Sequence, residues 1–219
     1  MIIIVEGIDR IGKTTLCKKV SELYNYSYVE RPMRRVLNIT DKQYDDLCNY
    51  IWSKDNKNVV LSFFILGNLL TRYYGENIVA DRHILSSYYW DSNEQNEEIF
   101  DYFYRGDVVP DLTLILYASQ EVRRNRIIKR NANDPDINEL ANNSSGYDKM
   151  IKFAKRIDMP YIIVNTENMS ENEVFEYCTE ILSKFLNEDT TTKKELCDYY
   201  NNLFIENNNV NTKKLCLTC

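Results

Sequence analysis

The sequence predicts an α/β protein with a five-stranded parallel sheet and helices on both of its faces. Short apolar runs rich in β-branched residues recur along the 219-residue chain, and stretches long enough for helices separate them. Strands that alternate with helices in this way form parallel sheets, because each helix carries the chain back across the sheet. The first apolar run is followed by a glycine-containing segment, GIDRIGKTT, at residues 7–15. Together these features predict a single α/β domain in which the chemistry follows the strands.

The apolar runs and the stretches between them define the expected elements. Strands are predicted at Ile2–Val5, Tyr26–Val29, Ile78–Ala80, Leu112–Tyr117 and Tyr161–Val164. Helices are predicted at Thr14–Tyr24, Asp41–Trp52, Val59–Tyr74, Ile84–Trp90, Glu94–Tyr104, Glu121–Arg130, Tyr147–Arg156 and Glu171–Leu186. Ligands of such folds bind at the carboxyl ends of the strands. Polar side chains follow four of the five predicted strands, so this edge is where a site is expected.

The segment GIDRIGKTT fits the phosphate-loop pattern G-x-x-x-x-G-K-[ST]. Gly7 and Gly12 permit backbone angles that let consecutive N–H groups turn toward an anion. Lys13 can reach the outer phosphates of a nucleoside triphosphate, and the Thr14 hydroxyl can hold Mg²⁺. The loop lies between a strand and a helix, which is the context that the mechanism requires. The residues expected to bind ATP here are Gly7, Ile8, Asp9, Arg10, Ile11, Gly12, Lys13, Thr14 and Thr15.

Composition excludes several other classes of protein. The net charge is −6, whereas a protein that tracks duplex DNA with its surface is usually basic, so no nucleic-acid partner is expected. No apolar run approaches the ~20 residues of a membrane span. The chain enters its first strand directly, without the pattern of a signal peptide, so we expect a cytoplasmic protein with reduced cysteines.

Two segments stand apart from the predicted α/β core. Residues 131–145, NANDPDINELANNSS, are polar and aperiodic, and their length favours a short lid over the site, with a passive loop as the alternative. Beyond residue 186 the composition changes to Asn, Thr, Lys and Glu. We therefore expect one folded domain over residues 1–186 and an extension over 187–219, with a helix at Lys193–Ile205 and disorder from Asn207 onward.

The order of several motifs resembles the thymidylate kinases, within the P-loop nucleoside monophosphate kinases. The resemblance covers about residues 1–186. It is carried by IIIVEGIDRIGKTT at the start, ERP at 30–32, FFILGN at 63–68, VADRHILSSYYW at 79–90 and PDLTLILYASQEVRRNRIIKR at 110–130. The Asp9-Arg10 pair inside the loop is similar to the eukaryotic and viral form of the family. The resemblance implies transfer of the γ-phosphate of ATP to a deoxynucleoside monophosphate, most specifically dTMP, with Mg²⁺ as cofactor.

The resemblance also implies roles for charged residues around the transferred phosphate. Lys13, Arg10 and Arg82 form the implied catalytic set, because cations stabilise the charge that develops on the transferred group. Asp81 resembles the acid that organises Mg²⁺ together with Thr14. Asp9 resembles the acid that contacts the sugar of the acceptor, and neutralisation of Arg10 is the alternative. A monophosphate nucleophile requires no general base, so we interpret His83 as a packing residue.

The acceptor site implied by the family is less complete. Arg31 would hold the acceptor phosphate, although Arg34 and Arg35 compete for that role. Phe64 resembles the aromatic residue that stacks on the acceptor base, with Phe63 or a purely structural role as alternatives. The family has an arginine where this chain has Asn68, and Arg72, one helical turn later, could replace it.

Two further features of the resemblance concern the adenine and the oligomeric state. Four arginines crowd the helix before the expected lid, at positions 123, 124, 126 and 130. We assign Arg126 to the adenine of ATP and the other three to a solvated face. Family members are commonly homodimers, and the apolar helix around residues 63–70 is the candidate contact for a homodimer of this chain.

Two other functions fit the same loop. A deoxynucleoside kinase adds the first phosphate and would use Glu30 as base for the 5′-hydroxyl. A P-loop protein that binds nucleotide but has lost or redirected catalysis is the third reading, favoured by Asn68 and by the missing glycine-rich stretch after ERP.

Overall fold

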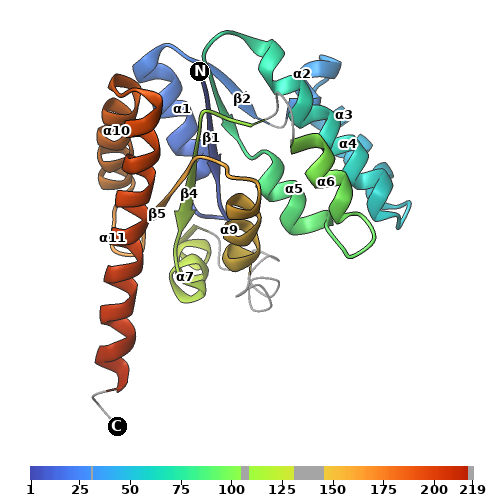
Figure 1. Cartoon of the computed structure of the whole chain (residues 1–219). Helices are drawn as coiled ribbons and strands as arrows, with labels where there is room; N and C mark the ends of the chain where they lie inside the picture. The colour runs from blue at the N-terminus through green and yellow to red at the C-terminus, as the bar shows by residue number, and fades with distance from the viewer. Residues whose placement is uncertain (31, 105–108, 131–145, 217–219) are drawn as a thin grey trace.

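The computed structural model describes residues 1–30, 32–104, 109–130 and 146–216 (Figure 1). Its centre is one parallel sheet of five strands in the order β2-β3-β1-β4-β5. The strands are β1 (Ile2–Glu6), β2 (Ser27–Glu30), β3 (Ile78–Asp81), β4 (Leu112–Tyr117) and β5 (Tyr161–Asn165). Each lies within one residue of its predicted range. Ile3, Ile4 and Val5 are inaccessible to solvent, because helices cover the sheet on both sides.

The helices and the short 3₁₀ segment η1 follow the strands in alternation. They are α1 (Lys13–Tyr24), α2 (Pro32–Leu37), α3 (Asp41–Trp52), α4 (Lys57–Leu70), η1 (Thr71–Tyr74), α5 (Ile84–Asp91), α6 (Glu97–Tyr104), α7 (Gln120–Arg130), α9 (Gly146–Arg156), α10 (Glu171–Asn187) and α11 (Thr190–Cys216). Side chains fix two of the starts: Thr40 with Gln43, and Ser170 with Glu173, form capping boxes that satisfy the first free N–H groups of α3 and α10.

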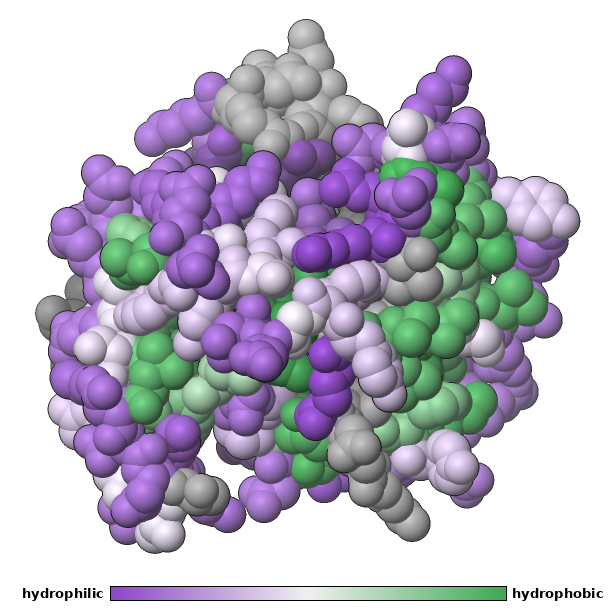
Figure 2. All heavy atoms as spheres, turned by 90° about the horizontal axis from the view of Figure 1, so that it is seen from above, coloured by the Kyte–Doolittle hydropathy of each residue, from purple (hydrophilic) through white to green (hydrophobic). Residues whose placement is uncertain are grey.

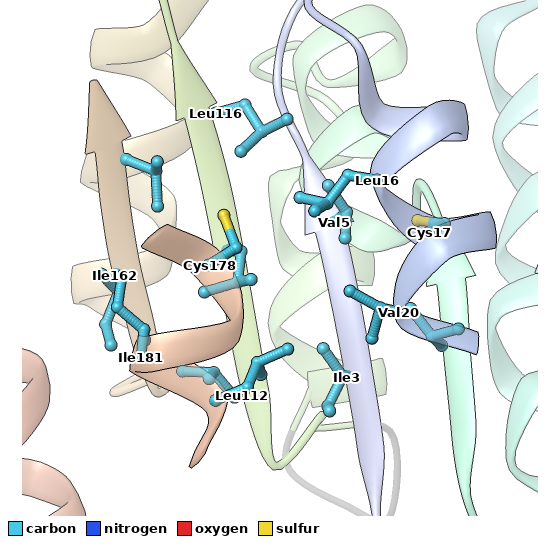
Figure 3. Close-up of a cluster of buried hydrophobic side chains, with 14 of the residues drawn as sticks. Ile3, Val5, Leu16, Cys17, Val20, Leu112, Leu116, Ile162, Cys178 and Ile181 are labelled. Carbon is cyan, nitrogen blue, oxygen red and sulfur yellow. The ribbon is translucent and has the colours of Figure 1, made fainter. Parts of the chain in front are cut away.

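One face of the sheet packs against α1, α10 and α11. Figure 3 shows Leu16 of α1 beside Val5 and Val20 of α1 beside Ile3, and Ile181 of α10 belongs to the same cluster. All five are at most 3 % exposed. This face is therefore a continuous apolar core, and it holds α1 rigidly behind the loop that precedes it.

The opposite face packs against α4, α5, α6 and α9. Its core contains Leu61 and Ile65 from α4, Leu85 from α5 and Phe153 from α9. Aromatic rings fill its outer part, where Tyr88 of α5 lies parallel to Phe153 with 3.9 Å between ring centroids. Because α5 is clamped between α4 and α9, the residues that follow β3 are fixed relative to those that follow β1.

The sequence did not predict α2. This helix is six residues long and runs from Pro32 to Leu37. Proline suits the first helical position, because the ring presets its backbone angle and the missing N–H has no partner there. Thr71–Tyr74, expected as the end of α4, form η1 instead. The expected lid at 131–145 lies outside the described residues.

The extension differs from its predicted form. One helix, α11, covers residues 190–216, so residues 207–216, expected to be disordered, are helical, and residues 217–219 lie outside the described part. Cys197 and Tyr200 of α11 belong to the apolar core on the α1 side. The amide of Asn201 accepts a hydrogen bond from the N–H of Ile163 and donates one to the carbonyl of Tyr161, both 2.9 Å. The helix is therefore packed on the core and bonded to the free edge of β5, which explains why it forms.

Within the described ranges, none of the helices combines the length and the apolar character needed to cross a membrane.

Replacing Asn201 by alanine leaves the N–H of Ile163 and the carbonyl of Tyr161 without their partner on α11. We expect a loss of about 1–3 kcal/mol in the free energy of unfolding, measured by urea denaturation. Asn202 is exposed and serves as the matched control, so Asn202→Ala should cost less than ~0.5 kcal/mol. Equal effects of the two variants would contradict this account of the edge.

Candidate active site

The loop after β1 has the backbone of an anion cradle. Gly7 and Gly12 adopt φ angles of 137° and 99°, which side chains disfavour. At Gly7 a Cβ would also lie 2.6 Å from the carbonyl oxygen of Leu116, so β4 leaves no space for one. Arg10 has a φ of 67° between them. The loop ends at the first turn of α1, whose N–H groups face an approaching anion.

Lys13 lies at the bottom of this cradle. Its ammonium group donates a 3.0 Å hydrogen bond to the carbonyl of Ile8, and the side chain is buried. Burial lowers the pKa of Lys13, while the carboxylates of Asp81 and Glu6 act in the opposite direction. The two carboxylates therefore help to keep a desolvated cation beside the loop, where phosphates would bind.

Two oxygen donors meet at the ends of β1 and β3. The Thr14 hydroxyl donates a hydrogen bond to the carboxylate of Asp81. Hydroxyl and carboxylate oxygens are ligands that Mg²⁺ prefers, and this ion usually takes one or two groups from the protein and the rest from water and phosphate. Among the described residues, no three His, Cys, Asp or Glu side chains gather as a metal site. The donor set thus fits a nucleotide-bound Mg²⁺ held by Thr14 and Asp81.

Glu6, the last residue of β1, ties the loop strand to α5. Its carboxylate accepts hydrogen bonds from the N–H groups of His83 (2.8 Å) and Ser86 (3.1 Å) and from the Ser86 hydroxyl (2.5 Å). Burial raises the pKa of Glu6, and these three donors lower it. Between β3 and α5, Arg82 has a φ of 72°, and its N–H donates to the carbonyl of Val5 at 3.0 Å. This set of bonds fixes Arg82 in a conformation that a non-glycine residue rarely adopts.

The Arg82 guanidinium forms an ion pair with Asp9 of the loop. Both side chains remain about one-third exposed, at 35 % and 38 %. The expected roles of Asp9, contact with the acceptor sugar or neutralisation of Arg10, stay predictions beside this ion pair. The pair places a cation next to the phosphate cradle, and its exposure leaves it accessible to a second anion.

A single cavity of about 1280 Å³ joins these groups. The loop residues from Asp9 to Thr15 line its middle. At one end it is bounded by Lys19, Arg126, Ile127, Met169, Val174 and Phe175, and at the other by Met33, Tyr44, Cys48, Trp52, Phe64, Asn68, Ser87, Trp90 and Asp91. Its volume exceeds the roughly 300–1,000 Å³ of a typical small-molecule site, so it has room for more than one such ligand. We call its two ends the α10 end and the α4 end.

The α4 end has an aromatic wall. Phe64 lines the cavity and lies 6.4 Å from Trp52 and 5.3 Å from Phe63, between ring centroids. Phe63 packs instead toward Tyr44, with 6.3 Å between centroids, and is not among the cavity residues. Of the two phenylalanines, Phe64 is therefore the one that can stack on a flat ring.

Asn68 also lines this end, and its amide donates to the Ser87 hydroxyl at 3.1 Å. Arg72 does not reach the cavity, contrary to the prediction. It lies in η1, exposed, and its guanidinium donates to the carbonyl of Val109 at 3.4 Å. The helix ends at Leu70, and the tighter 3₁₀ turn directs Arg72 away from the face that Phe64 and Asn68 share.

Arg31 lies outside the described residues, but its two competitors are placed. Arg34 forms an ion pair with Asp41, and Arg35 donates to the carbonyl of Tyr28 at 2.9 Å while lying over the Tyr74 ring. Neither lines the cavity. Glu30, the residue before Arg31, does line it.

Arg126 lines the α10 end, and its guanidinium donates to the hydroxyl and the carbonyl of Thr166. Arg123, on the same helix, was expected on a solvated face together with Arg124. It is buried instead, with its guanidinium 5.8 Å from the centre of the Tyr147 ring. The side chain of Ile8, predicted among the ATP-binding residues, lies in the core, and only its backbone faces Lys13.

Several residues of the α10 end escaped sequence analysis. Met169 comes from the segment after β5, and Val174 and Phe175 come from α10. The polar residues after β5 were the available signal, because ligands bind at strand ends. Their apolar neighbours carry no comparable signal. Only the folded structure shows that these apolar residues line the cavity.

The cradle, the buried lysine, the Thr14–Asp81 pair and a cavity for two ligands define a P-loop phosphotransferase. Residues 3–149 match the sequence family described as "AAA domain". A probable thymidylate kinase of Thermoplasma volcanium is 30 % identical over 152 residues, which cover 60 % of this chain and 73 % of that protein. The chain therefore belongs to the P-loop nucleotide kinases, in the thymidylate kinase family.

Solved structures agree with this fold. A thymidylate kinase from Candida albicans matches 86 % of this chain and 93 % of its own, with a TM-score of 0.61 at 17 % identity. A thymidylate kinase from Ehrlichia chaffeensis matches 84 % and 98 %, with a TM-score of 0.55 at 20 % identity. A deoxyadenosine kinase from M. mycoides matches 84 % and 100 %, with a TM-score of 0.54 at 19 % identity.

His83 generates a pH dependence of stability. Its ring nitrogen Nε2 lies 3.1 Å from the carbonyl of Asn68, and burial lowers its pKa from 6.5 to about 4. Between these values the unfolded chain binds a proton that the folded protein does not. His83 thus stabilises the fold fully above pH 6.5, and this contribution is lost as the pH falls toward 4.

We therefore expect the unfolding free energy of the wild type, relative to His83→Phe, to fall by about 2–3 kcal/mol between pH 7 and pH 4. Urea denaturation of both proteins across this range measures it. The difference between them removes the titration of all other groups. A pH-independent difference would show that His83 is not held neutral.

Proposed function

We propose that this enzyme transfers the γ-phosphate of ATP to a deoxynucleoside monophosphate, with dTMP as acceptor and dTDP as product. The single observation that carries the proposal is the cavity with the phosphate cradle in its middle. One end offers Arg126, Met169 and Phe175 to an adenine, and the other offers an aromatic wall and a polar edge to a second base. The two nucleotides would meet with their phosphates between Lys13 and Arg82.

Each charged group then has a role in the transfer. The loop N–H groups and Lys13 hold the phosphates of ATP, and Arg82 grips the phosphate of the acceptor. Mg²⁺ held by Thr14 and Asp81 would supply positive charge to the donor oxygens. Arg10 lines the same cavity from within the loop, where its charge can follow the transferred group. Arg31 is assigned a second contact with the acceptor phosphate.

The acceptor oxygen that attacks is already anionic, so the transfer needs positioning and positive charge and no general base. This agrees with the surroundings of His83, which is held neutral in a buried position and bonded to the backbone of Asn68. Phe64 would stack on the acceptor base, and base–aromatic stacking contributes about 1–3 kcal/mol in other nucleotide sites. Asn68 and Ser87 would contact the base edge, where an amide can serve as donor or acceptor.

The alternative that a specific observation favours is a deoxynucleoside kinase. Glu30 lines the cavity and could accept the proton of a 5′-hydroxyl. The adjacent Arg31 favours an acceptor that already carries a phosphate, which is why the monophosphate kinase is preferred.

Homodimer formation is part of the proposal. Apolar surface gathers on the side of the molecule that α2–α6 occupy (Figure 2). Val59 and Leu66, both on α4 and seven residues apart, are 40 % and 46 % exposed. Residues at this spacing share one helix face, so α4 could pack against its copy. Sedimentation of the wild type and of Leu66→Glu tests this contact, and a wild-type monomer would refute it.

A panel of acceptors tests the reaction itself. Purified enzyme with Mg·ATP is offered dTMP, dCMP, dAMP, dGMP, thymidine and deoxyadenosine, and ADP release is measured. We expect the monophosphates to be accepted, with dTMP giving the highest kcat/KM. Activity confined to the unphosphorylated nucleosides would favour the deoxynucleoside kinase. Tight ATP binding without any acceptor-dependent ADP release would leave only a nucleotide-binding protein.

Lys13→Ala tests the donor site. Loss of the cation beside the phosphates should lower kcat/KM by about 10²–10³-fold or more. The unfolding free energy should change by less than ~1 kcal/mol, because within the described part of the chain the ammonium group makes one hydrogen bond, to the loop carbonyl of Ile8. Lys18, exposed on α1, provides the control, and Lys18→Ala should retain full turnover. Unchanged turnover in Lys13→Ala would refute the donor site.

A further inference from the structure

Asp91 ends α5 and lines the α4 end of the cavity. It follows Ser87 by four residues, so the two side chains lie on one face of the helix. Ser87 is bonded to Asn68 of α4, which lines the same end. Asn68, Ser87 and Asp91 thus form a polar strip beside the aromatic wall.

Asp91 is nearly buried, and its carboxylate has no partner among the residues that the structure describes. The residue is 8 % exposed. Within residues 1–30, 32–104, 109–130 and 146–216, its carboxylate makes no hydrogen bond and no ion pair; only its backbone carbonyl accepts a bond, from Asn96. Because Asp91 lines the cavity, the donors for this carboxylate come from within the cavity, from water or from a bound ligand.

The neighbouring lysines act on Asp91 only at a distance. Lys57 donates to the carbonyl of Trp90 at 3.4 Å, and Lys149 donates to those of Tyr89 (3.0 Å) and Ser92 (3.3 Å). Burial raises the pKa of Asp91 to about 6, while both lysines lower it. The group is therefore mostly ionised at neutral pH, and an ionised carboxylate only accepts hydrogen bonds.

A nucleoside monophosphate offers few donors at this place. Its phosphate is an anion that Asp91 would repel, and the phosphate is assigned to Arg82, at the opposite end of α5. The helical rise puts Asp91 about 10 Å from Ile84 along the axis of α5. At that depth, beside Trp52, Phe64 and Trp90, the acceptor base is the part of the ligand expected to lie.

We propose that the Asp91 carboxylate accepts a hydrogen bond from an N–H group on the edge of the acceptor base, the N3–H of thymine when dTMP is bound. The inference rests on the proposed function, since it requires a nucleotide at the α4 end. Asp91 is then a specificity-determining residue of the acceptor site.

Two variants and two ligands test this contact. Asp91→Ala removes the acceptor group, and the nearly isosteric Asp91→Asn keeps a weaker, neutral one. Each is assayed with dTMP and with its N3-methyl derivative, which lacks the N3–H donor. Two readouts are used: KM in the kinase assay, and the Kd from the fluorescence of Trp52 and Trp90, which are the two tryptophans of the chain and both line the cavity.

For dTMP we expect Asp91→Ala to raise KM and Kd tenfold or more, with Asp91→Asn between it and the wild type. The KM for ATP and kcat should stay within twofold. N3-methylation should weaken binding to the wild type at least tenfold more than binding to Asp91→Ala. Asp46→Ala, at an exposed acidic position on α3, is the matched control and should leave all values unchanged.

Failures of the two proposals are distinguishable. If wild type and Asp91→Ala bind dTMP equally, or if N3-methylation costs both the same, the Asp91 contact is refuted while the kinase assignment stands. If the wild type binds dTMP but does not phosphorylate it, the proposed reaction fails, and the fluorescence titrations still decide on Asp91. A wild type that binds no dTMP refutes both. Thermal unfolding confirms that each variant is folded before the assays are compared.

Discussion

The site depends on one buried carboxylate between two strands. Glu6 accepts three hydrogen bonds from His83 and Ser86, and it thereby joins the end of β1 to the start of α5. A buried carboxylate that loses its donors is costly, so these bonds resist opening. These bonds therefore fix the distance between the loop after β1 and Arg82, which follows β3. Catalysis by positioning requires this kind of rigidity, because the phosphates themselves provide the reacting atoms.

Charges around Glu6 are arranged in opposing pairs. Lys13 lies near the carboxylates of Asp81 and Glu6, and Arg82 is paired with Asp9. Each cation is thus held in place before a phosphate arrives, and little reorganisation remains for the bound state. The apolar packing of α1 and α5 against opposite faces of the sheet keeps these pairs from drifting apart. The apolar core therefore fixes the positions of the charged groups in the site.

The sequence predicted the strands and the cradle because their signals are local. β-Branched runs such as Ile2–Val5 and the glycines at positions 7 and 12 restrict the backbone wherever they occur. Side-chain partners at long range could not be predicted in this way. The ion pair of Asp9 with Arg82 joins residues 73 positions apart. Arg72 does not line the cavity, because α4 ends at Leu70. Phe175 lines the cavity because α10 packs beside α1, a contact that no local pattern in the sequence encodes.

The bonding of Asn201 to β5 has a consequence for synthesis of the protein. The strand emerges from the ribosome well before α11, so for a time its outer N–H and carbonyl groups have no internal partner. Such an edge is open to pairing with strands of other nascent chains. Once α11 has formed, Asn201 pairs with this edge of β5. The C-terminal helix then reduces the tendency of the protein to aggregate through that edge.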